Sequence, residues 1–238
     1  MTRRRWIADE VSGTRAALVG AHAEHLSRVL RARVGQEFDI TTGNEVRRGR
    51  ITAITTDRIE FELGDEIPAL VPVQVTLVLS IFKFDRMEWA IEKCTELGAA
   101  RIIPAIASRT EAHLAAAAAK RSDRWRRIAL QSAEQSRRIA PPEITQPSKL
   151  KDAAALPGSL RILLSETETG TTLKDVLQSH RGGGDVVLAL GPEGGWTHEE
   201  LQLFQEAGWT SASLGSTILR AETAAIASLA VALAELQA

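Results

Sequence analysis

The first 70 residues carry short segments in which hydrophobic and polar side chains alternate. Alternation with period two is typical of strands that bury one face. We expect such strands at Glu37–Thr41, Gly49–Thr55 and Arg58–Leu63. One helical stripe interrupts them at Ala21–Arg31, where Leu26, Val29 and Leu30 would share a face. Short strands at this density predict a small β-barrel.

The pattern changes after a segment bounded by two prolines. Pro68 and Pro72 interrupt both helices and sheet ladders. We therefore place one domain at residues 1–70 and a second at residues 71–238. Beyond the boundary, wholly apolar runs alternate with amphipathic stretches, which predicts an open α/β fold with a parallel sheet. The expected strands are Val73–Leu79, Arg101–Ala105, Arg161–Leu164, Val186–Leu190 and Ala212–Leu214.

Helices of the second domain are predicted from apolar residues at helical spacing and from residues typical of helix ends. A helix over Arg86–Leu97 would be capped by Asp85 and ended by Gly98. Its apolar stripe would contain Met87, Ile91, Cys94 and Leu97. A longer helix at Ser122–Arg137 would bury Trp125, and an alanine-rich helix at Ala224–Leu236 has small residues on several faces.

Composition narrows the classes of protein. The 238 residues are 44% hydrophobic, enough for a folded core, and the single cysteine excludes an intramolecular disulfide and a thiolate zinc cluster. A reducing compartment, the cytoplasm, is the expectation. No apolar run approaches the roughly 18 residues of a membrane span. The net charge is -1, but residues 71–150 hold 13 basic and 8 acidic side chains, a net +5.

The most informative segment follows the predicted strand Val186–Leu190. The strand runs directly into three glycines within five residues, in the sequence GPEGG. Ligands of open α/β sheets bind beyond the carboxyl ends of the strands, and glycines allow close approach of the backbone. A tight turn would not need three glycines, so we expect a ligand loop. Glu199 and Glu200 read as helix-capping acids, since Thr197 and Glu200 form a capping box.

A second loop of this kind follows the last predicted strand and reads LGSTILRAETAA at residues 214–225. Arg220, between apolar residues and a helix start, is suited to bind an anion or a carboxylate. Glu222 is equally readable as an acid that stabilises a helix N-terminus. Neither loop has a phosphate-binding motif, and the five histidines form no ligand set, so metal chemistry is not indicated.

Arginines are concentrated in two regions. Runs of this kind are usually solvated helix faces, but guanidinium groups also suit phosphates and stacked bases. The positive middle segment favours RNA as the partner. The candidate RNA-binding residues are Arg3, Arg4, Arg5, Arg28, Arg31, Arg124, Arg126, Arg127, Arg137 and Arg138.

These segments together resemble the RsmE family, bacterial methyltransferases that modify ring nitrogen 3 of a uridine in 16S ribosomal RNA. The resemblance rests on GPEGG at 191–195 and LGSTILRAETAA at 214–225. It extends to HLSRVLRARVGQ at 25–36, MEWAIEKCTELGAARIIPAIASRT at 87–110 and RWRRIALQSAEQSRRIAPPEI at 124–144. Similar motifs thus recur in order over nearly the whole chain.

The resemblance implies a PUA-like β-barrel followed by a SPOUT-type domain with a C-terminal trefoil knot. It implies a homodimer, the small ribosomal subunit as partner, and S-adenosyl-L-methionine as methyl donor. The donor would be held by Leu164, Leu190, Gly191, Pro192, Gly194, Gly195, Leu214, Gly215, Ile218 and Leu219. Arg220 would stabilise charge on the uracil, and Glu222 would accept a proton or orient Arg220.

Two other functions remain compatible with the sequence. One is a SPOUT methyltransferase that acts on tRNA or 23S ribosomal RNA. The other is a non-catalytic RNA-binding protein of ribosome assembly that keeps the fold without turnover. Binding of the methyl donor would separate the second from the enzymes.

Overall fold

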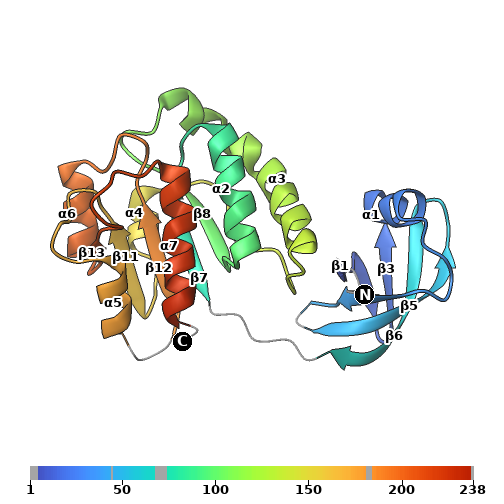
Figure 1. Ribbon diagram of the computed structural model, residues 1–238. Helices are drawn as coiled ribbons and strands as arrows, with labels where there is room; N and C mark the ends of the chain where they lie inside the picture. The colour runs from blue at the N-terminus through green and yellow to red at the C-terminus, as the bar shows by residue number, and fades with distance from the viewer. Residues whose placement is uncertain (1–4, 44, 68–73, 181–183, 237–238) are drawn as a thin grey trace. The chain divides into compact units, whose positions relative to one another are not determined.

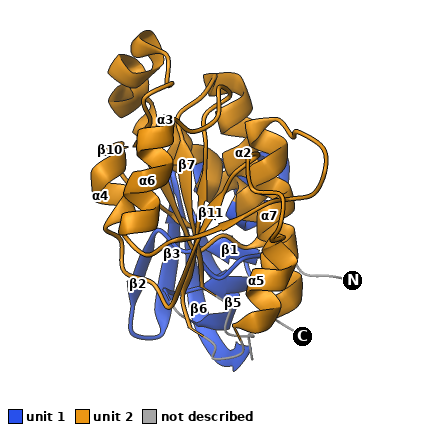
Figure 2. Cartoon of the chain, turned by 90° about the vertical axis from the view of Figure 1, so that its left-hand side faces the viewer, with its two compact units in different colours: residues 1–71, 133–141 blue, residues 72–132, 142–238 orange. Residues whose placement is uncertain are grey.

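The computed structural model describes residues 5–43, 45–67, 74–180 and 184–236 (Figure 1). The chain forms two compact units, residues 1–71 with 133–141, and residues 72–132 with 142–238 (Figure 2). The sequence placed residues 133–141 in the second domain, whereas the structure packs them with the first unit. Most of the predicted linker, at 68–72, lies outside the described residues.

The first unit is built on a six-stranded sheet in the order β1-β4-β5-β6-β3-β2. Strand β1 runs parallel to β4, and the other neighbours are antiparallel. Ile51, Ile59 and Phe61 point into its core. The three strands before residue 20 were not predicted. The strands are β1 Arg5–Ile7, β2 Glu10–Ser12, β3 Arg15–Val19, β4 Glu37–Thr41, β5 Val46–Ile54 and β6 Arg58–Ile67.

The helical insert of this unit differs from the predicted regular helix. A short helix, α1 (Ala21–Glu24), continues as a π-helical turn, His25–Val29, in which the Leu30 N–H donates to the His25 carbonyl at 3.1 Å. The wider turn changes which residues share a face. Leu26 is fully buried, but Val29 is 65% exposed, so its predicted place in the stripe was wrong.

Polar contacts hold the segment 133–141 within the first unit. His22 Nδ1 lies 3.0 Å from Asp9 Oδ1, and its Nε2 lies 3.6 Å from Glu134 Oε1. Burial of Glu134 raises the pKa of its carboxyl. The Arg5 guanidinium donates to the carbonyl of Arg137. The contacts of His22 with Glu134 and of Arg5 with Arg137 join residues more than 100 positions apart, which no local pattern could reveal.

The second unit contains a parallel sheet in the order β10-β8-β7-β12-β11-β13, with β9 also paired to β8. The predicted α/β class with a parallel sheet is confirmed. The last strand is Thr210–Ala212, two residues before the predicted Ala212–Leu214, and at Ser213 the backbone pairs instead with the segment before α5, where the Ser213 N–H donates to Thr171 O at 2.9 Å. The strands are β7 Val75–Ser80, β8 Arg101–Ile106, β9 Glu143–Ile144, β10 Ser148–Lys149, β11 Leu160–Leu164, β12 Val186–Leu190 and β13 Thr210–Ala212.

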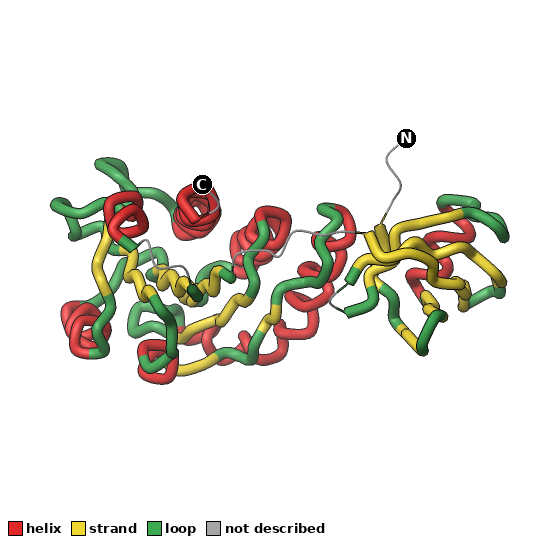
Figure 3. Tube along the Cα trace, turned by 90° about the horizontal axis from the view of Figure 1, so that it is seen from below, coloured by secondary structure: helices red, strands yellow, loops and turns green. Residues whose placement is uncertain are grey.

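Helices lie on both sides of this sheet (Figure 3). One apolar cluster joins it to α2 (Phe84–Leu97), α3 (Ala112–Gln135), α5 (Leu173–Ser179) and α7 (Ala221–Leu236). The opposite cluster includes α4 (Leu150–Ala154) and α6 (His198–Glu206). Both faces of the central strands are therefore buried, which explains their unbroken apolar runs. None of the helices in the described part of the chain is long and apolar enough to cross a membrane.

Helix α2 follows the predicted stripe with two differences. Lys83 occupies the N-cap position and Asp85 lies in the first turn, so Asp85 is not the cap. Leu97 at the other end is 40% exposed. Cys94 is buried as predicted, and burial raises the pKa of its thiol to about 12.

Candidate functional site

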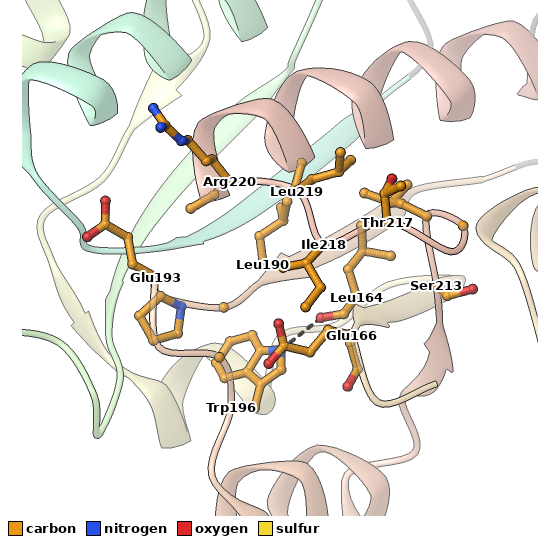
Figure 4. Close-up of a pocket in the computed structure, with 18 of the residues that line it drawn as sticks. Leu164, Glu166, Leu190, Glu193, Trp196, Ser213, Thr217, Ile218, Leu219 and Arg220 are labelled. Atoms are coloured by element: carbon orange, nitrogen blue, oxygen red, sulfur yellow. Dashed lines mark hydrogen bonds between the residues drawn. The ribbon is translucent and has the colours of Figure 1, made fainter. Parts of the chain in front are cut away.

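A cavity of about 310 Å³ lies in the second unit, beside the carboxyl ends of β11 and β12 (Figure 4). Its walls come from the segments that follow these strands and from the loop between β13 and α7. Parallel strands place their carboxyl ends at one edge of the sheet, so distant segments meet there. Of the residues predicted to hold a methyl donor, those lining the cavity are Leu164, Leu190, Gly191, Pro192, Gly195, Leu214, Gly215, Ile218 and Leu219.

The glycines of the first loop serve close packing within the protein. Gly195 has φ +71°, and a Cβ there would lie 2.6 Å from Glu166 Oε1. A Cβ on Gly191 would lie 3.2 Å from the ring of Trp196. The Trp196 indole N–H donates to the Leu164 carbonyl at 2.8 Å. The sequence suggested that these glycines leave space for a ligand. In the structure, Trp196 and Glu166 occupy part of that space and form part of the cavity wall.

The helix after this loop begins as predicted. Thr197 and Glu200 form the capping box, and the Glu200 carboxylate also accepts from the Ser108 N–H at 2.7 Å. The side chain of Glu200 is buried with both oxygens engaged. Glu200 is therefore a structural residue that joins α6 to the loop after β8.

The second loop brings Arg220 to the cavity but not Glu222. Arg220 is exposed and forms no ion pair with any described residue. Figure 4 shows Arg220 and Glu193 at one side of the cavity and Ser213 and Thr217 at the opposite side. Glu222 is 5% exposed and lies behind the wall. Its Oε1 is 3.8 Å from Arg86 Nε, and its buried Oε2 has no hydrogen-bond partner among the described residues.

Arg86 links the two loops, which the sequence did not predict. From the first turn of α2, its Nη1 donates to Glu193 Oε1 at 2.7 Å, while its Nε faces Glu222. Arg86 itself lines the cavity. Nothing in the local sequence distinguishes it from an ordinary helix-surface arginine, since its partners are more than 100 residues away. The sequence also missed Glu166, Trp196, Ser213 and Thr217 as cavity residues.

The chemistry of the cavity suits an elongated ligand with an apolar and a charged part. Leucine and isoleucine side chains form the apolar walls, and Ile218 is 82% exposed at the rim. Backbone groups of Gly191, Gly195 and Gly215 adjoin these walls, and charged side chains lie among them. No cluster of three or more histidine, cysteine, aspartate or glutamate side chains among the described residues could hold a metal ion.

Comparison with known proteins identifies the family. An RNA methyltransferase domain model matches residues 70–233. A ribosomal RNA small subunit methyltransferase E of Synechocystis is 31% identical over 93% of this chain and 74% of its own length. The chain belongs to the ribosomal RNA small subunit methyltransferase E family.

Other members of this methyltransferase E family agree with the match. The Aquifex aeolicus protein of the same name is 29% identical over 94% of this chain and 96% of its own. A crystal structure of the Neisseria gonorrhoeae protein, bound to S-adenosyl methionine, is 30% identical, covers 96% of both chains and has a TM-score of 0.85. The family resemblance drawn from the sequence motifs is confirmed, and the chain is an RNA methyltransferase.

The methyltransferase carries its predicted RNA-binding arginines in both units. In the first unit, Arg28 pairs with Glu24 at 3.2 Å, while Arg31 and Arg137 are exposed and have positive φ. Burial lowers the pKa of the Arg138 guanidinium to about 10. Arg5 is bound to the Arg137 carbonyl. Arg3 and Arg4 lie outside the described residues.

The arginines of α3 differ in how they are held. Arg124 forms a two-point pair with Glu88, at 2.7 and 2.8 Å. Arg126 pairs with Asp123 at 2.8 Å and donates to the Ile144 carbonyl at 3.1 Å. Arg127 is exposed and forms no ion pair within the described residues. Of these three, Arg127 needs to break no ion pair with a described residue to meet a phosphate.

Replacement of Arg86 by alanine is expected to destabilise the second unit. The buried Glu222 carboxylate would lose the guanidinium that lies 3.8 Å from it, and breaking a buried pair typically costs about 3–5 kcal/mol. Because Arg86 is 31% exposed, we expect about 2 kcal/mol in urea unfolding. The double variant R86A/E222Q should recover most of this loss, since a neutral amide needs no cation. No recovery would show that Arg86 acts through Glu193 alone.

Proposed function

We propose that this chain transfers a methyl group from S-adenosyl-L-methionine to N3 of a uridine in 16S ribosomal RNA of the small subunit. The observation that carries the proposal is the cavity itself. Both loops that carry the family resemblance line it, at the carboxyl edge of the sheet, with the exposed Arg220 at its rim. Family membership supports the reaction class.

The residues present fit the methyl donor. Leu164, Leu190 and Ile218 offer apolar contact for the adenine ring, and the backbone of the two loops offers donors and acceptors for polar groups. Glu166, Glu193 and Arg86 provide charges for the amino-acid part. The bound donor supplies a methyl group already activated by its sulfonium. The cavity therefore has to hold the donor and exclude misaligned poses, and positioning is a large part of catalysis.

The acceptor has different needs. N3 of uracil carries a proton and lies on the edge used for base pairing, so the base has to leave its stack. The Arg220 guanidinium is available to stabilise negative charge that develops on the uracil oxygens. Glu222 is buried beside Arg86 and does not line the cavity, so we assign it to holding Arg86 and not to accepting the proton.

Other features of the family are part of the proposal. The second unit would contain the trefoil knot, and the six-stranded sheet of the first unit would form the PUA-like barrel that binds RNA. Two chains would pair through α7, which exposes small side chains at Thr223, Ala230 and Ala234 and so allows close approach.

A donor-binding and methylation experiment tests the function. We expect saturable calorimetric binding of S-adenosyl-L-methionine and transfer of labelled methyl to small subunits from a strain lacking the gene. Mass spectrometry should place the label on N3 of one uridine of 16S RNA. Label on tRNA or 23S RNA would show that the proposed substrate, 16S RNA, is wrong. If the protein bound no methyl donor, the alternative of a non-catalytic RNA-binding protein would stand.

The double variant R126A/R127A is expected to weaken RNA binding by a few fold and to flatten its salt dependence. Each lost phosphate contact makes the negative slope of log K against log salt shallower by about 0.7–0.9. Most of the effect should come from R127A alone, because Arg126 is already paired with Asp123. Filter binding over a salt series measures both quantities. An unchanged slope would mean that this face of α3 only contacts solvent.

A further inference from the structure

The loop between β8 and α3 reaches the glycine loop of the cavity through Arg109. Its Nη1 donates to the carbonyl of Gly194 and, at 3.3 Å, to the carbonyl of Trp196. The two acceptors flank Gly195, the residue with positive φ. One guanidinium group thus spans the tightest part of the loop.

The loop that carries Arg109 is itself well held. The Ala107 N–H donates to Thr110 Oγ1 at 3.1 Å, and Thr110 Oγ1 donates to the Ile81 carbonyl at 3.3 Å. The Ser108 N–H donates to the buried Glu200 carboxylate at the start of α6. Arg109 therefore extends from a rigid support and can fix the more irregular glycine loop opposite.

The same contact gives a reason for a glycine at position 194. Of the residues predicted to bind the methyl donor, Gly194 is the one that does not line the cavity. A Cβ at Gly194 would lie 3.2 Å from Cδ and 3.4 Å from Cβ of Arg109. To accept that Cβ, Arg109 would have to shift by a few tenths of an ångström. Gly194 thus leaves room for the close approach of Arg109, while Gly195 allows the turn.

We propose that Arg109 is a positioning residue for the methyl donor. It holds the carbonyls of residues 194 and 196, so that Gly195 keeps its conformation and Trp196 stays against Leu164 in the cavity wall. Arg109 does not line the cavity and acts through the loop alone. The inference rests on the proposed function, because it assumes that this cavity takes S-adenosyl-L-methionine.

Variants at residue 109 test the inference by calorimetry. R109A should raise the Kd for S-adenosyl-L-methionine about tenfold, the effect of losing charged hydrogen bonds at an exposed site. R109K should give an intermediate Kd, since the ammonium keeps a charged donor but does not reach the position of Nη1, which donates both bonds. At saturating donor the kcat should stay near the wild-type value, and so should RNA affinity and Tm.

Two further variants separate positioning from general stability. G194A should raise the donor Kd in the same way, and R109A/G194A should cost less than the two single changes together, because both break one contact. R101A is the matched control: Arg101 begins β8, the strand that precedes the loop of Arg109, and its ion pair is with Glu143 at the surface. R101A should leave the donor Kd unchanged.

The possible outcomes distinguish the inference from the proposed function. Wild-type donor affinity in R109A, or equal losses in donor affinity, RNA affinity and Tm, would overturn the positioning role alone. Fully additive effects of R109A and G194A would also overturn it. If the wild-type protein binds no S-adenosyl-L-methionine, the proposed function fails first, whatever the variants do.

Discussion

The variant G195V is expected to lose about 100-fold in affinity for S-adenosyl-L-methionine, equivalent to about 3 kcal/mol. Gly195 has φ +71°, which a β-branched residue adopts only with strain. The added Cβ would also lie 2.6 Å from Glu166 Oε1, so Glu166 would have to move within the cavity wall. Both effects distort the loop where the donor is proposed to bind.

Calorimetry with the donor and filter binding with RNA measure this result. RNA affinity should survive, because the change is confined to the cavity. The control is G208V at the end of α6, where φ is +77° and the nearest atom to a Cβ is Arg161 Nη2 at 3.3 Å. G208V should lower Tm while donor affinity stays. Unchanged donor affinity in G195V would place the donor elsewhere.

The variant R220A is expected to lower kcat for methylation by about 100- to 1,000-fold, the usual loss when one donor to a developing oxyanion is removed. Arg220 is exposed at the rim of the cavity and has no internal ion pair among the described residues, so its guanidinium is available to substrate. RNA affinity should fall only a few fold, because many other arginines contribute to it. Tm should not change.

Single-turnover methylation, compared with RNA binding under the same salt, distinguishes catalysis from anchoring. R220K keeps a cation but loses the planar fork, so we expect partial activity. R101A, whose surface pair lies away from the cavity, is the control for charge removal and should keep full activity. If the methylation rate and RNA affinity fell equally in R220A, Arg220 would be an anchor for RNA and not a catalytic residue.

Strands and helices of the second unit were largely readable because their local patterns are strong. Val186–Leu190 is a strand of the same bounds in structure and prediction, and Thr197 caps α6 as its spacing indicates. Errors occurred where tertiary contacts overrode local pattern. Strand β13 stops at Ala212, and at Ser213 the backbone pairs instead with the segment before α5, while the π-helical turn at His25–Val29 displaces Val29 from the apolar face.

The site was predictable to a different degree. The glycine loop was identifiable because several glycines directly after a buried strand indicate that another group approaches the backbone closely. The side chains that support the two loops could not be predicted. Arg86 and Arg109 lie in stretches of sequence typical of surface helices and loops, and each finds its partners more than 80 residues away. From the sequence, Glu222 could be a helix-end acid or a catalyst; in the structure it lies buried beside Arg86, which is the basis for the proposal that it holds Arg86.

By itself, the sequence determined the α/β class with its parallel sheet, the family and the two loops of the site, because these depend on residues close together in the chain. Only the tertiary structure decided which side chains support those loops, which arginines are already paired, and that residues 133–141 belong with the first unit. The reason is physical. Periodicity and turn chemistry act over a few residues, whereas ion pairs and close packing depend on where the folded chain brings distant residues together.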